Sequence, residues 1–396
     1  MTDEVRLSPA AAALVADRPV FDAHADSLQR ALDLGHDLAV AGPGHLDLER
    51  GAAGGLGTLV FVSWVDPKFH EQGPGGALSR TRDLLGAFHE LAQRRPDRVR
   101  FAGNGRALAE ARSHGAVAGI PGIEGGHSIE ESLDNLEWFF ERGVRVMTLV
   151  WNNHLSWIRS CQAGAGSTIP EGLSDFGRLV VRTMNELGMV VDLSHAGERS
   201  FYDTLDATKK PVIASHSGCK ALHGHQRNLT DDQLRALAAN GGVVGIVFCT
   251  AFLDADAQRH DAETRKHAEL AAITGPNETD VFLRQSEYMQ RATPPLAMER
   301  VMDHIYHAID VAGLDHVGLG SDYDGIQRTP RGLEHAGCYG RIAEHMLARG
   351  FSAADVRKVL GGNMERVFAA VTGLGSAAHD APLVPLVSSN ARGVCT

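Results

Sequence analysis

The run Val20-Phe21-Asp22-Ala23-His24-Ala25-Asp26 is the first of five short apolar stretches in this sequence that stop at His, Asp or Glu. The other four stop at Glu124, His195, His216 and Asp322. A run of β-branched residues that ends in this way places its last side chain at the carboxyl end of a strand. Because a parallel barrel gathers those ends at one face, the five runs predict a single polar site at the mouth of a (β/α)8 barrel.

Eight strand-like runs alternate with helix-like runs, which is typical of βαβ units. We expect strands near residues 19–24, 56–64, 116–123, 145–151, 188–194, 211–216, 242–248 and 316–321. Helical periodicity fills most of the gaps, for example from Ser128 to Arg142 and from Asp231 to Ala239. Strands buried on both faces should be apolar throughout, and most of these runs are. The pattern therefore predicts an α/β fold of the TIM-barrel type.

Two stretches fall outside this rhythm. Residues 66–80 contain Gly and Pro and are expected to form a long βα loop, whereas residues 250–296 are polar and partly helical, from His260 to Ala272. Long insertions at the carboxyl face of a barrel usually shape substrate access. There is no internal repeat, so we expect one catalytic domain over residues 1–396, with the barrel core at about 19–370 and a tail at 376–396.

Composition excludes several classes of protein. Hydrophobic residues make up 43% of the 396 positions, which is enough for a packed core. The 38 Lys and Arg against 49 Asp and Glu give a net charge of −11, which argues against binding to nucleic acids or anionic membranes. Five Cys without CxxC spacing suit a reducing compartment. With no secretory signal and no long apolar span in view, we expect a cytoplasmic protein.

The first and third runs carry candidate metal ligands. His24 and Asp26 are two residues apart, so on a strand both side chains face the same side and can reach one cation. Glu124 precedes Gly125-Gly126, which lets the backbone approach a ligand closely, and its two oxygens can bridge two cations. The alternatives are a His-Asp pair that hydrogen-bonds locally and a carboxylate at a helix N-terminus. Five strand ends with ligand-type side chains favour metal.

His195 and His216 end neighbouring runs. One buried His is commonly a hydrogen-bonded core residue, but burying two without partners would cost on the order of several kcal/mol. We therefore expect a two-metal site, in which His24, Asp26 and Glu124 hold one cation and Glu124, His195 and His216 the other. Imidazole and carboxylate ligands without thiolate suit zinc.

Two further residues are candidates for the reaction itself. Asp322 ends the last run, where a carboxylate could take a proton from water and give it to a leaving group. Asp324 competes for this role, because residues i and i+2 share a face, and the alternative for this segment is an Asx turn. Arg227 follows the sixth run and could bind a substrate carboxylate, although a solvated loop Arg is more common.

These residues resemble the membrane dipeptidase (renal dipeptidase) family, dinuclear zinc peptidases of the amidohydrolase superfamily. The resemblance covers roughly residues 19–370 and rests on an ordered set of motifs, which includes Asp22-Ala23-His24-Ala25-Asp26, Gly122-Ile123-Glu124-Gly125-Gly126-His127, Gly172-Leu173-Ser174-Asp175-Phe176-Gly177, Asp192-Leu193-Ser194-His195, Ser215-His216-Ser217, Arg227-Asn228-Leu229, Gly320-Ser321-Asp322-Tyr323-Asp324-Gly325 and Gly361-Gly362-Asn363.

The resemblance implies a (β/α)8 barrel with two Zn²⁺ ions per chain that hydrolyses dipeptides, L-D as well as L-L, through a hydroxide that bridges the two ions. It places zinc ligation on the five residues above, with Glu124 bridging. Asp322 would be the general acid and base, and Arg227 would bind the substrate carboxylate. A homodimer is common in the family.

One position departs from the family pattern. Members often carry a His at the end of the fourth strand that contacts the substrate carbonyl, whereas this chain has Trp151 there and His154 three residues later. Either the metal alone stabilises the developing oxyanion, or His154 reaches in from the loop. Two rival functions stay open: an amidohydrolase for N-acyl amino acids or cyclic amides, and a non-catalytic metal-binding barrel.

Overall fold

The computed structural model describes residues 6–71 and 73–373 and contains one parallel sheet. Its strands are β1 (Val20–Ala25), β2 (Leu56–Trp64), β3 (Val99–Phe101), β4 (Val117–Glu124), β5 (Val146–Thr148), β6 (Val190–Asp192), β7 (Ile213–Ser217), β8 (Val243–Ile246) and β9 (Val317–Leu319). The strand order is β2-β1-β9-β8-β7-β6-β5-β4-β3, and a further pairing of β2 with β4 closes the ring. Eight strands thus form the predicted (β/α)8 barrel.

Strand β3 is additional to the eight that were predicted. Its three residues pair with Val117 to Gly119 of β4, on the side where β5 pairs with the later residues of β4. It therefore extends the amino end of the barrel and leaves the ring of eight unchanged. A run of three residues is too short for a period-2 pattern to stand out in a sequence.

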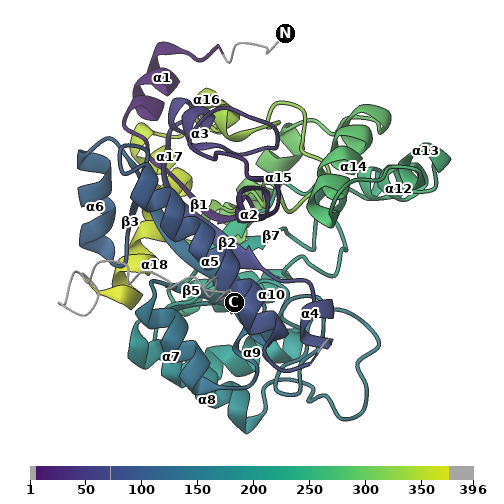
Figure 1. Cartoon of the computed structure of the whole chain (residues 1–396). Helices are drawn as coiled ribbons and strands as arrows, with labels where there is room; N and C mark the ends of the chain where they lie inside the picture. Colours follow the sequence, from purple (N-terminus) through teal and green to yellow (C-terminus); the bar gives the residue numbers. More distant parts are fainter. Residues whose placement is uncertain (1–5, 72, 374–396) are drawn as a thin grey trace, which may run out of the picture.

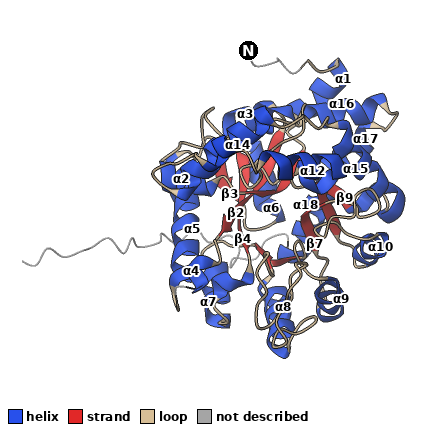
Figure 2. Ribbon diagram, turned by 90° about the vertical axis from the view of Figure 1, so that its right-hand side faces the viewer, coloured by secondary structure: helices blue, strands red, loops and turns tan. Residues whose placement is uncertain are grey.

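Helices surround the strands on the outside, as Figure 2 shows. They are α1 (Pro9–Ala16), α2 (Leu28–Leu34), α3 (Leu48–Ala53), α4 (Lys68–Glu71), α5 (Gly76–Arg94), α6 (Gly105–Ser113), α7 (Leu133–Glu141), α8 (Asp175–Leu187), α9 (Glu198–Ala207), α10 (Asp231–Ala239), α15 (Glu299–Ala312), α16 (Gly340–Ala348), α17 (Ala353–Arg357) and α18 (Asn363–Thr372). The prediction for residues 231–239 is confirmed.

Two predictions about the connections are wrong. Residues 66–80 are not a plain loop, because α4 lies within them and α5 starts at Gly76, where a Cβ would lie 2.1 Å from the carbonyl oxygen of Phe69. The glycines that suggested a loop mark the boundary between two helices. Residues 128–142 are not one helix, because Glu130 and Glu131 have positive φ and α7 begins only after the N-cap Ser132.

The insertion at residues 250–296 is more helical than expected. It forms α11 (Thr250–Leu253), α12 (Ala255–Thr264), α13 (Ala268–Ala271) and α14 (Glu278–Ala292), so the predicted helix from His260 to Ala272 is in fact parts of two helices. Figure 1 shows α12 to α14 projecting together on one side of the barrel. The side chains of Asn277 and Thr279 bind Asp33 of α2, which fastens the insertion to the barrel.

The two ends of the barrel differ in polarity. Interior side chains such as Phe21, Ile120 and Val243 pack with Met364 and Phe368 of α18, which covers the amino end. The polar candidate residues are left at the carboxyl end. No helix of the described ranges combines the length and the apolar composition needed to cross a bilayer. The predicted tail at residues 376–396 lies outside the described residues.

Candidate metal centre

Five of the predicted side chains meet at the carboxyl end of the barrel. His24 lies near the end of β1, Asp26 follows it, Glu124 is the last residue of β4, His216 lies in β7 and His195 follows β6. None of the five is more than 6% exposed. His195 has a φ of 67°, a backbone conformation that costs energy in a residue other than glycine and is often found at functional sites.

Glu124 lies between His24 and Asp26 on one side of the cluster and His195 and His216 on the other. Its Oε1 atom is 2.9 Å from Nε2 of His195 and 3.3 Å from Nε2 of His216. Its Oε2 atom is 3.6 Å from Nε2 of His24, and that nitrogen is 3.5 Å from Oδ2 of Asp26. One carboxylate oxygen thus faces each side, which is the arrangement expected of a bridging ligand.

Hydrogen bonds on the far side of two imidazoles fix which ring nitrogen carries the proton. The Oδ1 atom of Asn152 lies 2.9 Å from Nδ1 of His195 and can only accept, so Nδ1 is the donor. The Ser215 hydroxyl donates to Asp192 (2.6 Å) and therefore accepts from Nδ1 of His216 (2.8 Å). In both imidazoles this leaves the lone pair on Nε2.

Those lone pairs face each other. The Nε2 atoms of His195 and His216 are 3.1 Å apart, and both point at the same oxygen of Glu124. Three acceptors at such distances repel one another unless a cation lies among them. On the other side, Nε2 of His24 and Oδ1 of Asp26 are buried and make no hydrogen bond within the described residues. The donor set and its unsatisfied atoms fit divalent cations.

The pKa values of the cluster follow from burial and charge. Burial lowers the pKa of His195 to about 4 and that of His216 well below its usual range, so both are neutral, as ligands must be. Burial also lowers the pKa of His24, but the carboxylates of Glu124 and Asp26 outweigh it and raise that pKa well above the ordinary value. The part of the cluster around His24, Asp26 and Glu124 therefore attracts positive charge strongly.

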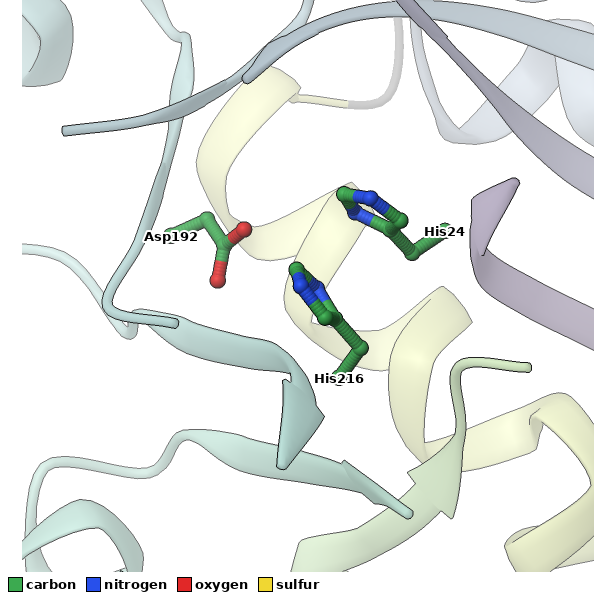
Figure 3. Close-up of side chains that lie close together, drawn as sticks. All are labelled: His24, Asp192 and His216. Carbon is green, nitrogen blue, oxygen red and sulfur yellow. The ribbon is translucent and has the colours of Figure 1, made fainter. Parts of the chain in front are cut away.

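Asp192 lies next to the cluster and was not predicted as a site residue. Figure 3 shows its carboxylate beside the imidazoles of His24 and His216, whose ring centroids are 3.7 Å apart. It accepts four hydrogen bonds, from the backbone of Ser194 and Ser215 and from the hydroxyls of Ser215 and Thr148. Because these bonds occupy its lone pairs, Asp192 positions its neighbours and does not bind a cation.

Asp322 and Asp324 have different environments. The carboxylate of Asp322 lies close enough to His24 and Asp26 to be grouped with them, and burial raises its pKa well above the usual value. Asp324 binds Arg30 at 2.8 Å and the backbone N–H of His45 at 2.7 Å. Burial raises the pKa of Asp324 too, but Arg30, His45 and Ser27 together outweigh it and the net shift is downward. Only Asp322 is free to exchange a proton in the site.

The remaining predicted residues lie around the cluster. The guanidinium of Arg227 donates from Nη2 to the carbonyl oxygen of His216 (3.0 Å), while its buried Nε has no partner among the described residues. The ring of Trp151 lies 6.1 Å from that of His195. Nδ1 of His154 accepts from the backbone N–H of Ser160 (3.3 Å) and lies 3.2 Å from its hydroxyl oxygen, which holds this ring in its own loop. No hydrogen bond among the described residues joins His154 to the cluster.

The residues that sequence reasoning missed are Asp192, Ser215 and Asn152. Asp192 and Ser215 stand inside two of the quoted runs, and each was passed over in favour of the His that follows it. The alternation of side chains along a strand was a signal for Asp192, because it places Asp192 and Ser194 on the same face. Asn152 had no comparable signal, since it lies in a loop whose path the sequence does not determine.

Comparisons with known proteins identify the family to which the chain belongs. The sequence model of the family described as membrane dipeptidase (peptidase family M19) matches residues 9–381. A solved structure described as dipeptidase AC, a metallopeptidase of family M19, is 28% identical over 90% of this chain and 99% of its own, with a TM-score of 0.74. A metallopeptidase from Rhodobacter sphaeroides, solved with a phosphinate mimic of L-Ala-D-Ala, is 26% identical over 89% and 99%, also with a TM-score of 0.74.

A probable dipeptidase of Pseudomonas aeruginosa, PvdM, shares the fold with a TM-score of 0.78 at 20% identity, over 93% of this chain and 100% of its own. At that identity the likeness concerns the fold alone. The family match, in contrast, spans almost the whole chain and includes every strand of the barrel. The chain therefore belongs to the membrane dipeptidase family, peptidase family M19, and is a metallodipeptidase.

Proposed function

We propose that this enzyme hydrolyses dipeptides, L-D as well as L-L, with two zinc ions at the carboxyl end of the barrel. The observation that carries the proposal is the convergence of three histidine Nε2 atoms, Asp26 and both oxygens of Glu124 in one buried cluster. The L-D part draws on the Rhodobacter sphaeroides relative, which was solved with a mimic of L-Ala-D-Ala.

The five side chains divide between two cations. His24 and Asp26 would hold one, His195 and His216 the other, and Glu124 would contribute one oxygen to each. Cations of this kind polarise a carbonyl group and lower the pKa of a bound water. Burial keeps the imidazoles of His195 and His216 neutral, and Asn152 and Ser215 direct their Nε2 lone pairs inward.

Asp322 would carry the proton in this reaction. Burial raises its pKa well above that of a free Asp, so its carboxylate can take a proton from the attacking water and the resulting carboxylic acid can give that proton to the leaving amine. The backbone N–H of Asp322 donates to the carbonyl oxygen of His24 at 3.0 Å. This bond keeps Asp322 close to the cation that His24 and Asp26 would hold. Its φ of 62° is a further sign that the backbone is held in place there.

Arg227 would bind the carboxylate of the substrate. Its guanidinium lies close enough to His195, His216 and Asp322 for its charge to affect the pKa of each. One face of the guanidinium covers the ring of Phe252 at 5.5 Å, and its unpartnered Nε leaves a donor for a bound anion. A carboxylate bound there would lie beside His195 and His216.

The test is Asp322→Asn with Asp324→Asn as the matched control. We expect Asp322→Asn to lower kcat for L-Ala-L-Ala and L-Ala-D-Ala by about 10²–10⁴-fold, because general acid and base catalysis contributes about that much. Its zinc content should stay at two per chain by elemental analysis. Asp324→Asn should lower thermal stability and change kcat little, since its carboxylate is bound to Arg30. Turnover and zinc content near wild type in Asp322→Asn would overturn the assignment.

A further inference from the structure

A cavity of about 370 Å³ opens next to the candidate metal centre. Its walls come from the loops that follow β5, β6 and β7, and they include both His195 and Arg227. A dipeptide whose carboxylate is bound by Arg227 would therefore place its C-terminal residue at or in this cavity. The volume is within the range of pockets that hold small ligands.

The interior of the cavity carries positive charge without a matching carboxylate. Arg227 is 3% exposed, Arg159 is half-buried, and neither forms an ion pair within residues 6–71 and 73–373. Among the described residues the guanidinium of Arg159 donates only to the backbone carbonyls of Ile169 and Pro170, which keeps its charge in place without neutralising it. At the exposed rim lies Lys220, which has no ion pair within the same ranges either.

The other charged residues of the wall do not neutralise this interior. Glu171 and Glu198 line the cavity but are exposed to solvent, which screens them. Arg199 is bound to Asp203, at 2.9 Å between Nε and Oδ1. An anion inside the cavity would therefore meet Arg159 and Arg227 at close range and the two glutamates only through water.

Two buried polar atoms of the wall lack a partner. Oγ of Ser217 and Nε of Arg227 are buried and make no hydrogen bond among the described residues. Leaving such groups unpaired is costly, on the order of 1–3 kcal/mol each, so proteins rarely keep them without a ligand or water to bind. Both are donors, so each can bind an oxygen of a carboxylate.

We propose that this cavity binds the side chain of the substrate's C-terminal residue and that it selects an acidic side chain, Asp or Glu. The inference rests on the proposed function, because Arg227 must hold the main-chain carboxylate for the side chain to enter. Ser217 and Arg159 would then receive the side-chain carboxylate from inside, and Lys220 would attract it from the rim.

The experiment compares isosteric substrates that differ in charge. We expect kcat/KM for L-Ala-D-Asp to exceed that for L-Ala-D-Asn by about tenfold or more, the effect of one charge-assisted hydrogen bond. D-Aspartate should likewise inhibit hydrolysis of L-Ala-D-Ala more strongly than D-asparagine does, a comparison that depends on binding alone. Both preferences should shrink as salt is added.

Reversing the charge of Lys220 tests whether the preference for Asp over Asn arises in this cavity. Lys220→Glu should reduce the Asp-to-Asn ratio by about threefold or more, because Lys220 is exposed and its charge is not neutralised by an ion pair among the described residues. Lys266→Glu, at an exposed position on the insertion, is the matched control and should leave the ratio unchanged. Ratios near one for both comparisons in the wild type would overturn this inference alone, whereas failure to cleave L-Ala-D-Ala would overturn the proposed function.

Discussion

Two pairs of neighbouring strands in this barrel are joined by the same device. Asp22 of β1 accepts from the backbone N–H and hydroxyl of Ser321 beyond the end of β9, at 2.9 and 2.5 Å. Asp192 of β6 accepts from the same two groups of Ser215 in β7, at 2.8 and 2.6 Å. Each carboxylate also accepts the backbone N–H two residues further along its own chain, at 3.2 and 3.0 Å. We call these the Asp22 clamp and the Asp192 clamp.

The two clamps differ in what their serines hold. The hydroxyl oxygen of Ser215 accepts from Nδ1 of His216, so the Asp192 clamp determines the tautomer of a candidate ligand. The hydroxyl oxygen of Ser321 accepts from the backbone N–H of Tyr323, so the Asp22 clamp holds the chain on either side of Asp322. One construction thus serves two purposes: it orients an imidazole in one place and a backbone segment in the other.

The largest effect is expected from Asp192→Asn and Asp22→Asn. An Asn side chain has only one acceptor oxygen, and its amide group would face donors that the carboxylate satisfied. Each substitution should therefore lower the free energy of unfolding by about 2–4 kcal/mol, measured by urea denaturation of protein stripped of metal. Zinc affinity, measured by calorimetric titration, should fall much more in Asp192→Asn, because that clamp holds a ring nitrogen of His216, whereas the Asp22 clamp meets His24 only at its backbone N–H.

Asp206→Asn, at an exposed position on α9, is the control for the loss of a charge and should change neither quantity. Equal losses of zinc affinity in the two clamp variants would remove the distinction between the clamps.

The parts of this site that the sequence predicted share one property. His24, Glu124 and His216 stand at the ends of apolar runs, and the alternating geometry of a strand alone determines where such side chains point. The eight-stranded ring follows from the same runs. The helices within residues 66–80 were missed because the glycines near Gly76 mark a junction between helices as readily as a loop.

The role of Asp192 was harder to predict for a different reason. Whether a buried carboxylate binds a cation or orients its neighbours depends on how many donors already occupy its oxygens, and those donors come from two other strands. The choice between Asp322 and Asp324 is similar, since it depends on Arg30, almost 300 positions away in the chain. Facts of this kind appear only when distant segments are brought together.

An intermediate effect is expected from the serines of the two clamps. Ser215→Ala leaves Nδ1 of His216 without its acceptor, so zinc affinity should fall by about 10–100-fold, as is typical when the partner of a ligating His is removed. Ser321→Ala should leave zinc affinity within about threefold of wild type and lower kcat instead, because the segment around Asp322 loses its anchor. The d–d spectrum of bound Co²⁺, which reports ligand geometry, should change in Ser215→Ala alone.

The opposite pattern, with a changed spectrum in Ser321→Ala and an unchanged one in Ser215→Ala, would exchange the roles of the clamps. A change in both would mean that the two serines act through the shared backbone.

The smallest effect is expected from the last donor to each carboxylate, the hydroxyl of Tyr339 on Asp22 and that of Thr148 on Asp192. Tyr339→Phe and Thr148→Val each remove one hydroxyl with little change in shape. Each should lower the free energy of unfolding by about 1 kcal/mol, read as a shift of the urea midpoint at constant slope. Zinc affinity should hardly change in either, because three donors still orient each carboxylate and Ser215 still meets His216. A loss of zinc affinity in Thr148→Val as large as that in Ser215→Ala would mean that the carboxylate's position, and not the serine hydroxyl, orients the imidazole.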